Sequence, residues 1–240
     1  GASAGMPTPA ALLEVRARVA ELEQDDRRAA EVLAEIVAHA ESLPHGRERD
    51  LTLATASTRL GLALARGERG DEAYQHLARA PALRKARLAP DDLVLAEALH
   101  NLATHRLHRG SEDEAASRFE AAIAIARQHG ERGGELEASA LHNLGVLREA
   151  QARDDDARLA WEQALAGRQA RLGPDHHSLR PTLVRLARLR ERTGSPLQAA
   201  VLFERARRLA AGELGAEHEV TRALDLCKRG AVDGGGSGPE

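Results

Sequence analysis

The sequence predicts an all-α fold of about five stacked helix-turn-helix units followed by a C-terminal capping helix. Two observations support this prediction. The stretch Ala-Leu-His-Asn-Leu at 98–102 recurs letter for letter at 140–144, and a fixed period in this range is typical of stacked repeats. The 240 residues include only two Phe, one Trp and one Tyr, so Ala and Leu carry the apolar content. Both favour helices, whereas aromatic and β-branched residues favour strands.

The 42-residue step extends well beyond the repeated stretch. Five positions of the period hold the same or a similar residue in four successive copies, which is too regular for chance. These positions are Leu60, Leu102, Leu144 and Leu186; Gly61, Ala103, Gly145 and Ala187; Ala73, Ala115, Ala157 and Ala199; Leu77, Phe119, Trp161 and Phe203; and Ala80, Ala122, Ala164 and Ala206.

Within one copy the spacing predicts two helices. Leu99 and Leu102 lie three apart on one face, and Ala115 and Phe119 lie four apart on a second. We expect the large residue of the second helix to face the small residue of the first, so that the helices approach closely and neighbouring copies share one core.

Several residues predict where these helices begin and end. His-Arg-Gly-Ser at 108–111 reads as the turn within a pair. Ser111 with Glu114 and Ser195 with Gln198 have the spacing of a capping box, and Pro196 follows Ser195 at a first helical position. Pro81 falls inside a second helix, where we expect it to kink or end that helix.

The period divides the chain. We expect a flexible segment or tag remnant at 1–9, units at about 10–47, 48–89, 90–131, 132–173 and 174–215, a capping helix at 217–229 and a flexible Gly-rich tail at 231–240. The first unit matches the pattern poorly, as is typical of a terminal repeat. Its expected faces are Leu12, Val15 and Val19, then Ala30, Leu33 and Val37.

This pattern resembles the tetratricopeptide repeat (TPR), with a small residue after Leu in the first helix and Ala-x3-aromatic-x2-Ala in the second. The period, with Leu-Gly-Pro-Asp-His-His-Ser-Leu at 172–179 and Leu-Gly-Ala-Glu-His-Glu-Val at 214–220, is similar to the kinesin-light-chain-type variant. The resemblance covers roughly 48–229. It implies a right-handed α-solenoid that binds a protein or peptide in a concave groove lined by the first helices. One departure is that the family's late aromatic of the first helix is Leu64, Arg106, Arg148 or Arg190 here.

The face of each first helix opposite the packing residues is the predicted binding surface. Asn amides there can hydrogen-bond an extended peptide backbone, and Arg favours carboxylates; a merely solvated polar face is the competing interpretation. The candidate partner-binding residues are Arg59, His100, Asn101, Thr104, His142, Asn143, Arg185 and Arg188.

Other site chemistries find little support in the sequence. His100, Thr104 and His108 share a helix face, but nothing nearby completes a zinc site, and we expect His176-His177 to be structural. Cys227 lacks a predicted base, and Gly-Glu-Arg-Gly-Asp-Glu at 67–72 lacks the Lys-Ser/Thr of a phosphate loop. We therefore expect no enzyme activity, no cofactor, no metal and no nucleic-acid partner.

The functional prediction is a non-catalytic scaffold for a protein or peptide segment, with an acidic ligand as one option. No apolar run is long enough to span a membrane, so a cytoplasmic protein is the default. Two alternatives stay open: a regulatory arm of a larger bacterial kinase- or NTPase-type signalling protein, and a self-assembling structural protein. Residues 14–41 hold eight acids and four Arg, while 179–208 hold eight Arg and two Glu. This asymmetry could steer an acidic ligand or promote head-to-tail association.

Overall fold

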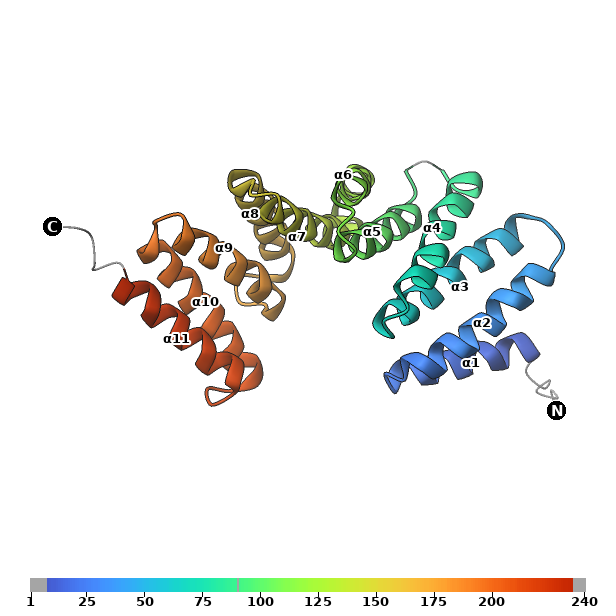
Figure 1. The fold of residues 1–240 in the computed structure, drawn as a ribbon, viewed down its shortest axis with the longest axis horizontal. Helices are drawn as coiled ribbons and strands as arrows, with labels where there is room; N and C mark the ends of the chain where they lie inside the picture. Colours follow the sequence, from blue (N-terminus) through green and yellow to red (C-terminus); the bar gives the residue numbers. More distant parts are fainter. Residues whose placement is uncertain (1–7, 90, 235–240) are drawn as a thin grey trace. The chain divides into compact units, whose positions relative to one another are not determined.

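The computed structural model describes residues 8–89 and 91–234, and within these ranges the chain is almost entirely helical (Figure 1). The described residues form five consecutive pairs of α-helices and one final helix, which confirms the predicted fold class. The helices are α1 (Pro9–Leu22), α2 (Asp26–Ser42), α3 (Arg47–Arg66), α4 (Gly70–Arg87), α5 (Leu93–His108), α6 (Glu112–Gln128), α7 (Gly134–Ala150), α8 (Asp154–Leu172), α9 (Arg180–Arg192), α10 (Pro196–Leu214) and α11 (Glu219–Gly234). None of them is both long and apolar enough to cross a membrane.

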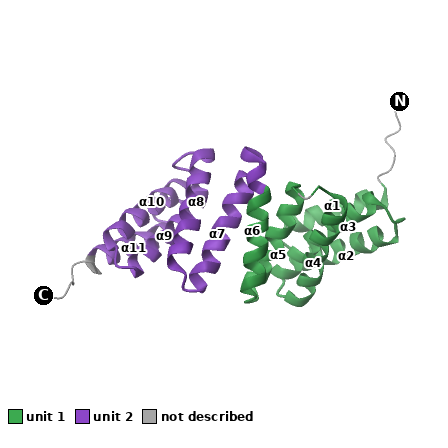
Figure 2. Ribbon diagram, turned by 90° about the horizontal axis from the view of Figure 1, so that it is seen from above, with its two compact units in different colours: residues 1–125 green, residues 126–240 purple. Residues whose placement is uncertain are grey.

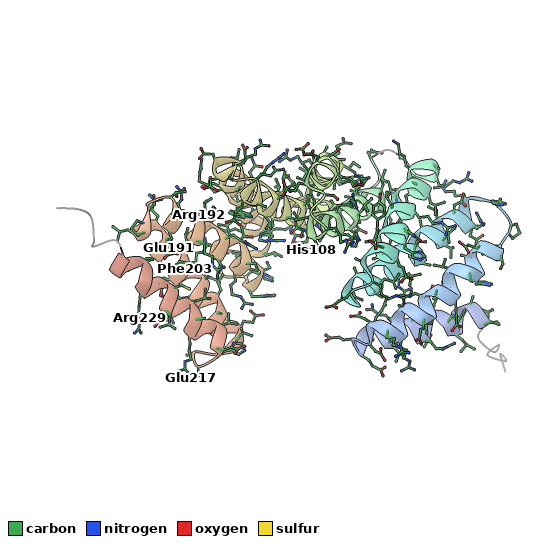
Figure 3. All side chains as sticks on the ribbon, viewed as in Figure 1. His108, Glu191, Arg192, Phe203, Glu217 and Arg229 are labelled. Carbon is green, nitrogen blue, oxygen red and sulfur yellow. The ribbon has the colours of Figure 1, made fainter. Side chains whose placement is uncertain are left out.

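The chain forms two compact units, residues 1–125 and 126–240 (Figure 2). The first contains α1 to α5 and most of α6, and its main core joins α1 to α4 around Leu33, Leu53 and Leu60. The second contains α7 to α11. Its core joins α9, α10 and α11 around Leu183, Phe203 and Leu224. In Figure 3, Phe203 lies among these helices, whereas Glu217 and Arg229 extend from their edge.

The repeated positions of the sequence are the packing positions of the structure. Every residue on the 42-residue register is buried except Leu144, which is half-buried. Phe119, Trp161 and Phe203 are at most 1% exposed, so the prediction that the aromatics belong to the core is confirmed.

The pairing of a small residue with a large one sets the distance between the two helices of a pair. A Cβ added to Gly61 would lie 2.7 Å from Leu77 Cγ, and one added to Gly145 would lie 2.4 Å from Trp161 Nε1. The absence of a side chain at these glycines therefore lets the second helix approach, as the sequence predicts.

Each turn within a pair contains one residue in the left-handed region. Along the register these are Glu68 (φ 61°), Gly110 (φ 73°), Ala152 (φ 55°) and Gly194 (φ 77°). The backbone conformation thus repeats where the residue does not, since only two of the four are glycines.

The turns between pairs in the second unit also repeat. Gly173 (φ 88°) and Gly215 (φ 93°) end α8 and α10 in the left-handed region. Downstream, a histidine ring accepts a backbone N–H in each turn: Ser178 N lies 3.3 Å from His176 Nδ1, and Val220 N lies 3.2 Å from His218 Nδ1. The structural role expected for His176 is confirmed.

Two features considered for the helix ends are not found in the structure. The helix α4 does not end at Pro81 but continues to Arg87, with Pro81 buried inside it. Ser195 occupies the N-cap position of α10, but its side chain forms no capping hydrogen bond. The tight turn fixes ψ at 58° for Ser195, as it does at 59° for Arg69 and 65° for Arg153 in the same position of earlier turns. This lies outside the extended region in which an N-cap hydroxyl reaches the helix N–H groups.

The ends of the chain also differ from expectation. Thr8 caps α1, which begins at Pro9, so the predicted flexible segment 1–9 overlaps the helix start. At the other end α11 reaches Gly234, beyond the predicted limit of 229 and into the expected tail; residues 1–7 and 235–240 lie outside the described ranges.

The packing face of α1 is not the one the sequence predicted. Leu12, Val15 and Val19 are between 39% and 61% exposed, whereas Ala17 and Ala20 are fully buried. The alanine face lets α1 lie close to α2, which leaves the larger apolar residues in solvent. The predicted face of α2 is confirmed, since Ala30, Leu33 and Val37 are buried.

Candidate functional site

In the first unit, Arg59 on α3 is already bound to carboxylates of the chain itself. Its Nε and Nη2 lie 2.9 and 3.2 Å from the two carboxylate oxygens of Glu21, and Nη1 lies 2.5 Å from Glu14, both on α1. The hydrogen bond from Arg59 lowers the pKa of Glu21. An acidic ligand at Arg59 would therefore compete with two internal carboxylates.

The pocket beside Arg59 is lined by three arginines and two acids. It measures about 710 Å³ and lies among α1, α2 and α3. Arg66 on its wall pairs with Asp26 at 2.6 Å, as Arg59 pairs with Glu21. The pocket thus presents both signs of charge rather than a preference for one.

On α5, the predicted residues His100, Asn101 and Thr104 differ in how far their side chains are free to contact a ligand. The ring of His100 is half-buried, 5.8 Å from the Phe119 ring, and Thr104 donates to the His100 carbonyl at 3.0 Å. Asn101 is half-buried, and its amide has no hydrogen-bond partner among residues 8–89 and 91–234. The amide of Asn101 is therefore the α5 group best able to bind a peptide backbone. Neighbouring His105 is buried and stacks on Tyr74.

On α7, His142 connects helices of the second unit instead of facing solvent freely. Its Nδ1 lies 2.9 Å from the hydroxyl of fully buried Thr182 on α9, and its carbonyl accepts the Trp161 indole N–H at 3.0 Å. Burial, together with the positive charges of Arg168 and Arg185, lowers the pKa of His142 to about 4. His142 is thus neutral at neutral pH, and adjacent Asn143 is half-buried.

On α9, Arg185 and Arg188 have different environments. Arg185 pairs with Glu149 at 3.0 Å, whereas Arg188 is exposed and has no ion pair within the described ranges. The basic segment 179–208 therefore carries less uncompensated positive charge than its sequence suggests, because most of its arginines pair with carboxylates. Those paired with a carboxylate are Arg180, Arg185, Arg190, Arg192 and Arg207.

A pocket of about 390 Å³ between α9 and α11 brings Arg185 and Arg188 together. Its walls are mostly apolar, and its arginines come from α9. The lining residues are Arg180, Pro181, Val184, Arg185, Arg188, Val220, Ala223, Leu224 and Cys227. Such a surface can hold an apolar side chain beside an anionic group.

The sequence reasoning missed the contribution of the capping helix to this pocket. The sequence predicts only a capping helix over 217–229, and Leu224 of α11 does lie in the core of the second unit. The spacing of Val220 with Ala223, Leu224 and Cys227 could have indicated that α11 also places an apolar stripe beside α9. Buried Arg84 on α4 was also missed.

The Tetratricopeptide repeat family profile matches residues 52–128 and 136–212, which is more than half of the chain. No curated protein matches the sequence significantly.

Solved structures of similar fold share little sequence with the chain. BtubC (BKLC) from P. vanneervenii is 23% identical with a TM-score of 0.72, covering 86% of this chain and 82% of that one. A putative kinesin light chain with nearly identical TPR-like repeats from Podosopora anserina is 21% identical with a TM-score of 0.70, covering 87% and 99%. The Rap conjugation gene regulator of the plasmid pLS20, in complex with the Phr* peptide, is 16% identical with a TM-score of 0.67, covering 94% and 61%. The repeat register, the packing of its small and large residues and the family match together show that this chain belongs to the tetratricopeptide repeat family.

Proposed function

We propose that the chain is a non-catalytic scaffold that binds a peptide or protein segment on its first-helix face, and that the segment carries acidic groups. The observation that carries this proposal is the pocket between α9 and α11, in which apolar walls adjoin the exposed Arg188, which forms no ion pair with the described residues. An apolar side chain of the ligand would enter between Val184 and Leu224. A neighbouring carboxylate would then pair with Arg188, because bidentate arginine–carboxylate contacts are strong and directional.

The other candidate residues fit this scheme with different roles. Asn101 and Asn143 would hydrogen-bond the ligand backbone without reading its sequence. Arg185 can turn from Glu149 toward a ligand, whereas Arg59 is held by two carboxylates and would contribute less. His142, bonded to Thr182, would position α7 against α9 rather than contact the ligand. His100 and Thr104 would border the Asn101 contact. Similarity to the Rap regulator, whose structure holds the Phr* peptide, is consistent with peptide binding.

A pull-down from native lysate, followed by titration of the captured protein's binding segment, tests the proposal. Two single variants alter the pocket: Arg188→Glu reverses its free charge, and Ala223→Trp fills its volume. We expect each to weaken binding by about tenfold or more, since a lost charged contact costs about 1.5–3 kcal/mol.

Arg208→Glu is the matched control, because Arg208 is exposed, lies outside this pocket and has no ion pair in the described part of the chain. It makes the same charge change without touching the site. Equal affinity of the intact chain and both pocket variants would show that the ligand binds elsewhere.

Self-association is a second candidate function, favoured by the exposed face of α1. Leu12, Val15, Val19 and Leu22 follow a three-four-three spacing and are 39% to 69% exposed. Such a stripe is the seam of a helical coiled coil. We infer that α1 can pair with α1 of a second copy.

Light scattering across a salt series, with Val15→Glu for comparison, tests this candidate. If the contact is an apolar seam, the intact chain should be dimeric at every ionic strength. The Val15→Glu variant should be monomeric. Monomers of the intact chain under all conditions would exclude the seam, and dimers retained by Val15→Glu would place the contact elsewhere.

A further inference from the structure

Arg84 on α4 is a buried cation that forms no ion pair within the described part of the chain. The residue is 5% exposed. Its guanidinium donates to the hydroxyls of Thr58 at 3.2 Å and Thr55 at 3.4 Å, both on α3. No carboxylate of the described residues lies within ion-pair distance of it.

The two threonines solvate this charge only as neutral acceptors. Their own hydroxyls donate to the carbonyls of Leu51 and Ala54. Burial lowers the pKa of Arg84, against the smaller opposing effects of Glu97 and Asp92. A buried charge without a counter-charge is costly, so this arrangement needs an explanation.

An equivalent arginine site occurs two 42-residue periods later in the chain and can be compared with Arg84. Arg168 on α8 occupies the position of Arg84, and Ser139 occupies that of Thr55. The Arg168 guanidinium donates to the Ser139 hydroxyl at 2.8 Å and to Glu135 at 3.2 Å. The position of Glu135 is filled by Leu51 in the earlier repeat. The arginine and the hydroxyl are thus retained, and the carboxylate is not.

The acid next to Leu51 in the sequence is engaged elsewhere. Asp50 precedes Leu51, and one position moves a side chain about 100° around a helix. One oxygen of Asp50 lies 3.0 Å from Arg49, and the other lies 2.7 Å from Arg87. Both oxygens of Asp50 are therefore taken by other arginines, and Asp50 forms no ion pair with Arg84.

We propose that Arg84, with Thr55 and Thr58, is a binding point for a carboxylate of a peptide ligand, which takes the place that Glu135 occupies beside Arg168. Thr55 is exposed and accepts from the guanidinium, so the buried Arg84 charge lies directly beneath Thr55 on the α3 surface. This point lies in the first unit and does not depend on the pocket between α9 and α11. Glu97 on α5 repels a carboxylate here, so Glu97→Gln should tighten binding.

The test follows the side-chain Nε–Hε resonance of Arg84 by nuclear magnetic resonance in the full chain, assigned with Arg84→Met. The probes are short capped peptides of alanine and serine with one central Glu, the same peptides with Gln, and uncapped peptides with a free C-terminal carboxylate. We expect the Arg84 resonance to shift with a carboxylate peptide and not with the Gln peptide. The Glu and free-terminus probes separate a side-chain ligand from a chain end.

Two reciprocal variants make the test specific. Leu51→Glu supplies the missing internal carboxylate, so it should raise the melting temperature and weaken binding of the carboxylate peptide by about tenfold or more. Glu135→Leu removes the carboxylate at Arg168 and should make the Arg168 resonance respond to the same peptide, which keeps the test informative if Leu51→Glu folds poorly.

Equal responses to the Glu and Gln peptides would overturn the proposal. So would unchanged binding in a folded Leu51→Glu variant, because the Arg84 guanidinium would then not be the group that binds. Neither result would bear on the pocket variants Arg188→Glu and Ala223→Trp, so the two proposals can fail separately.

Discussion

Replacing Gly145 by alanine should destabilise the second unit, although the same change usually stabilises a helix. In the interior of a helix, glycine is about 1 kcal/mol less favourable than alanine. At Gly145 in α7 the new methyl group would lie 2.4 Å from Trp161 Nε1 and 2.6 Å from Cδ1. The indole is fully buried and donates to the His142 carbonyl at 3.0 Å, so it cannot retreat without losing that bond.

The expected magnitude follows from these opposing terms. Overpacking of a rigid core costs about 1–3 kcal/mol, and loss of the buried indole hydrogen bond adds about 1–3 kcal/mol. Against the helix-propensity gain of about 1 kcal/mol, we expect Gly145→Ala to lower the free energy of unfolding by about 3 kcal/mol.

Urea unfolding monitored by circular dichroism measures this change, and Gly167→Ala is its matched control. Gly167 lies in α8 of the same unit, and an added Cβ there meets nothing within 4 Å. It should raise stability by about 0.5–1 kcal/mol. The register also supplies a compensating change, because Ala103 and Ala187 occur with Phe119 and Phe203. Gly145→Ala combined with Trp161→Phe should therefore be more stable than the sum of the single effects implies.

A Gly145→Ala variant as stable as Gly167→Ala would refute the reasoning. It would mean that the indole moves freely, and the close approach of α7 and α8 would then not depend on the missing side chain. Additive single effects in the double variant would contradict the direct contact as well.

Four further predictions concern the second unit. Trp161→Ala should lower the unfolding free energy by about 3–5 kcal/mol through cavity formation, and an unchanged thermal transition would contradict its core position. The pKa of His142, about 4 when folded against 6.5 in the unfolded chain, predicts that about 3 kcal/mol of stability is lost as the pH falls from 6.5 to 4. Urea midpoints at each pH should show this loss in the intact chain and a weaker one in His142→Gln. The Arg207 hydrogen bond, followed by Lys228, lowers the pKa of Glu204 to about 2. Its stabilisation is present above pH 4.5 and lost toward pH 2, and Glu204→Gln should remove about 1–2 kcal/mol at neutral pH after screening. Ala152→Gly should stabilise by about 1 kcal/mol, because Ala152 has a φ of 55°; a lower urea midpoint would show that this turn carries no strain.

The sequence predicts the fold well because the repeat register and the core coincide. Leu60, Phe119 and Ala206 are buried where their spacing places them. Helix ends were harder to predict. Ser195 has the residue type of a cap, but the turn sets its backbone away from the capping geometry, a tertiary constraint that local spacing does not contain.

The candidate site could be predicted only in part, since helical spacing gives the direction of a side chain but not its partner. Arg188 is exposed as expected, whereas Arg59 is bound by carboxylates of another helix. Arg84 was not predicted because it lies on the second helix of its pair and its side chain extends to α3. The repeat register shows which face a residue occupies but not which neighbouring helix its side chain contacts. Comparing positions two periods apart, where Glu135 corresponds to Leu51, would have indicated it.

The left-handed residue in each turn has a consequence for how such a chain can change in length. Because Glu68, Gly110, Ala152 and Gly194 occupy one conformation at one spacing, adding or deleting a residue there would rotate the following helix by about 100°. Its Ala and aromatic positions would then leave the core. Gains and losses that preserve packing are therefore whole periods of 42 residues, so duplication of complete repeats is the route by which this architecture can grow.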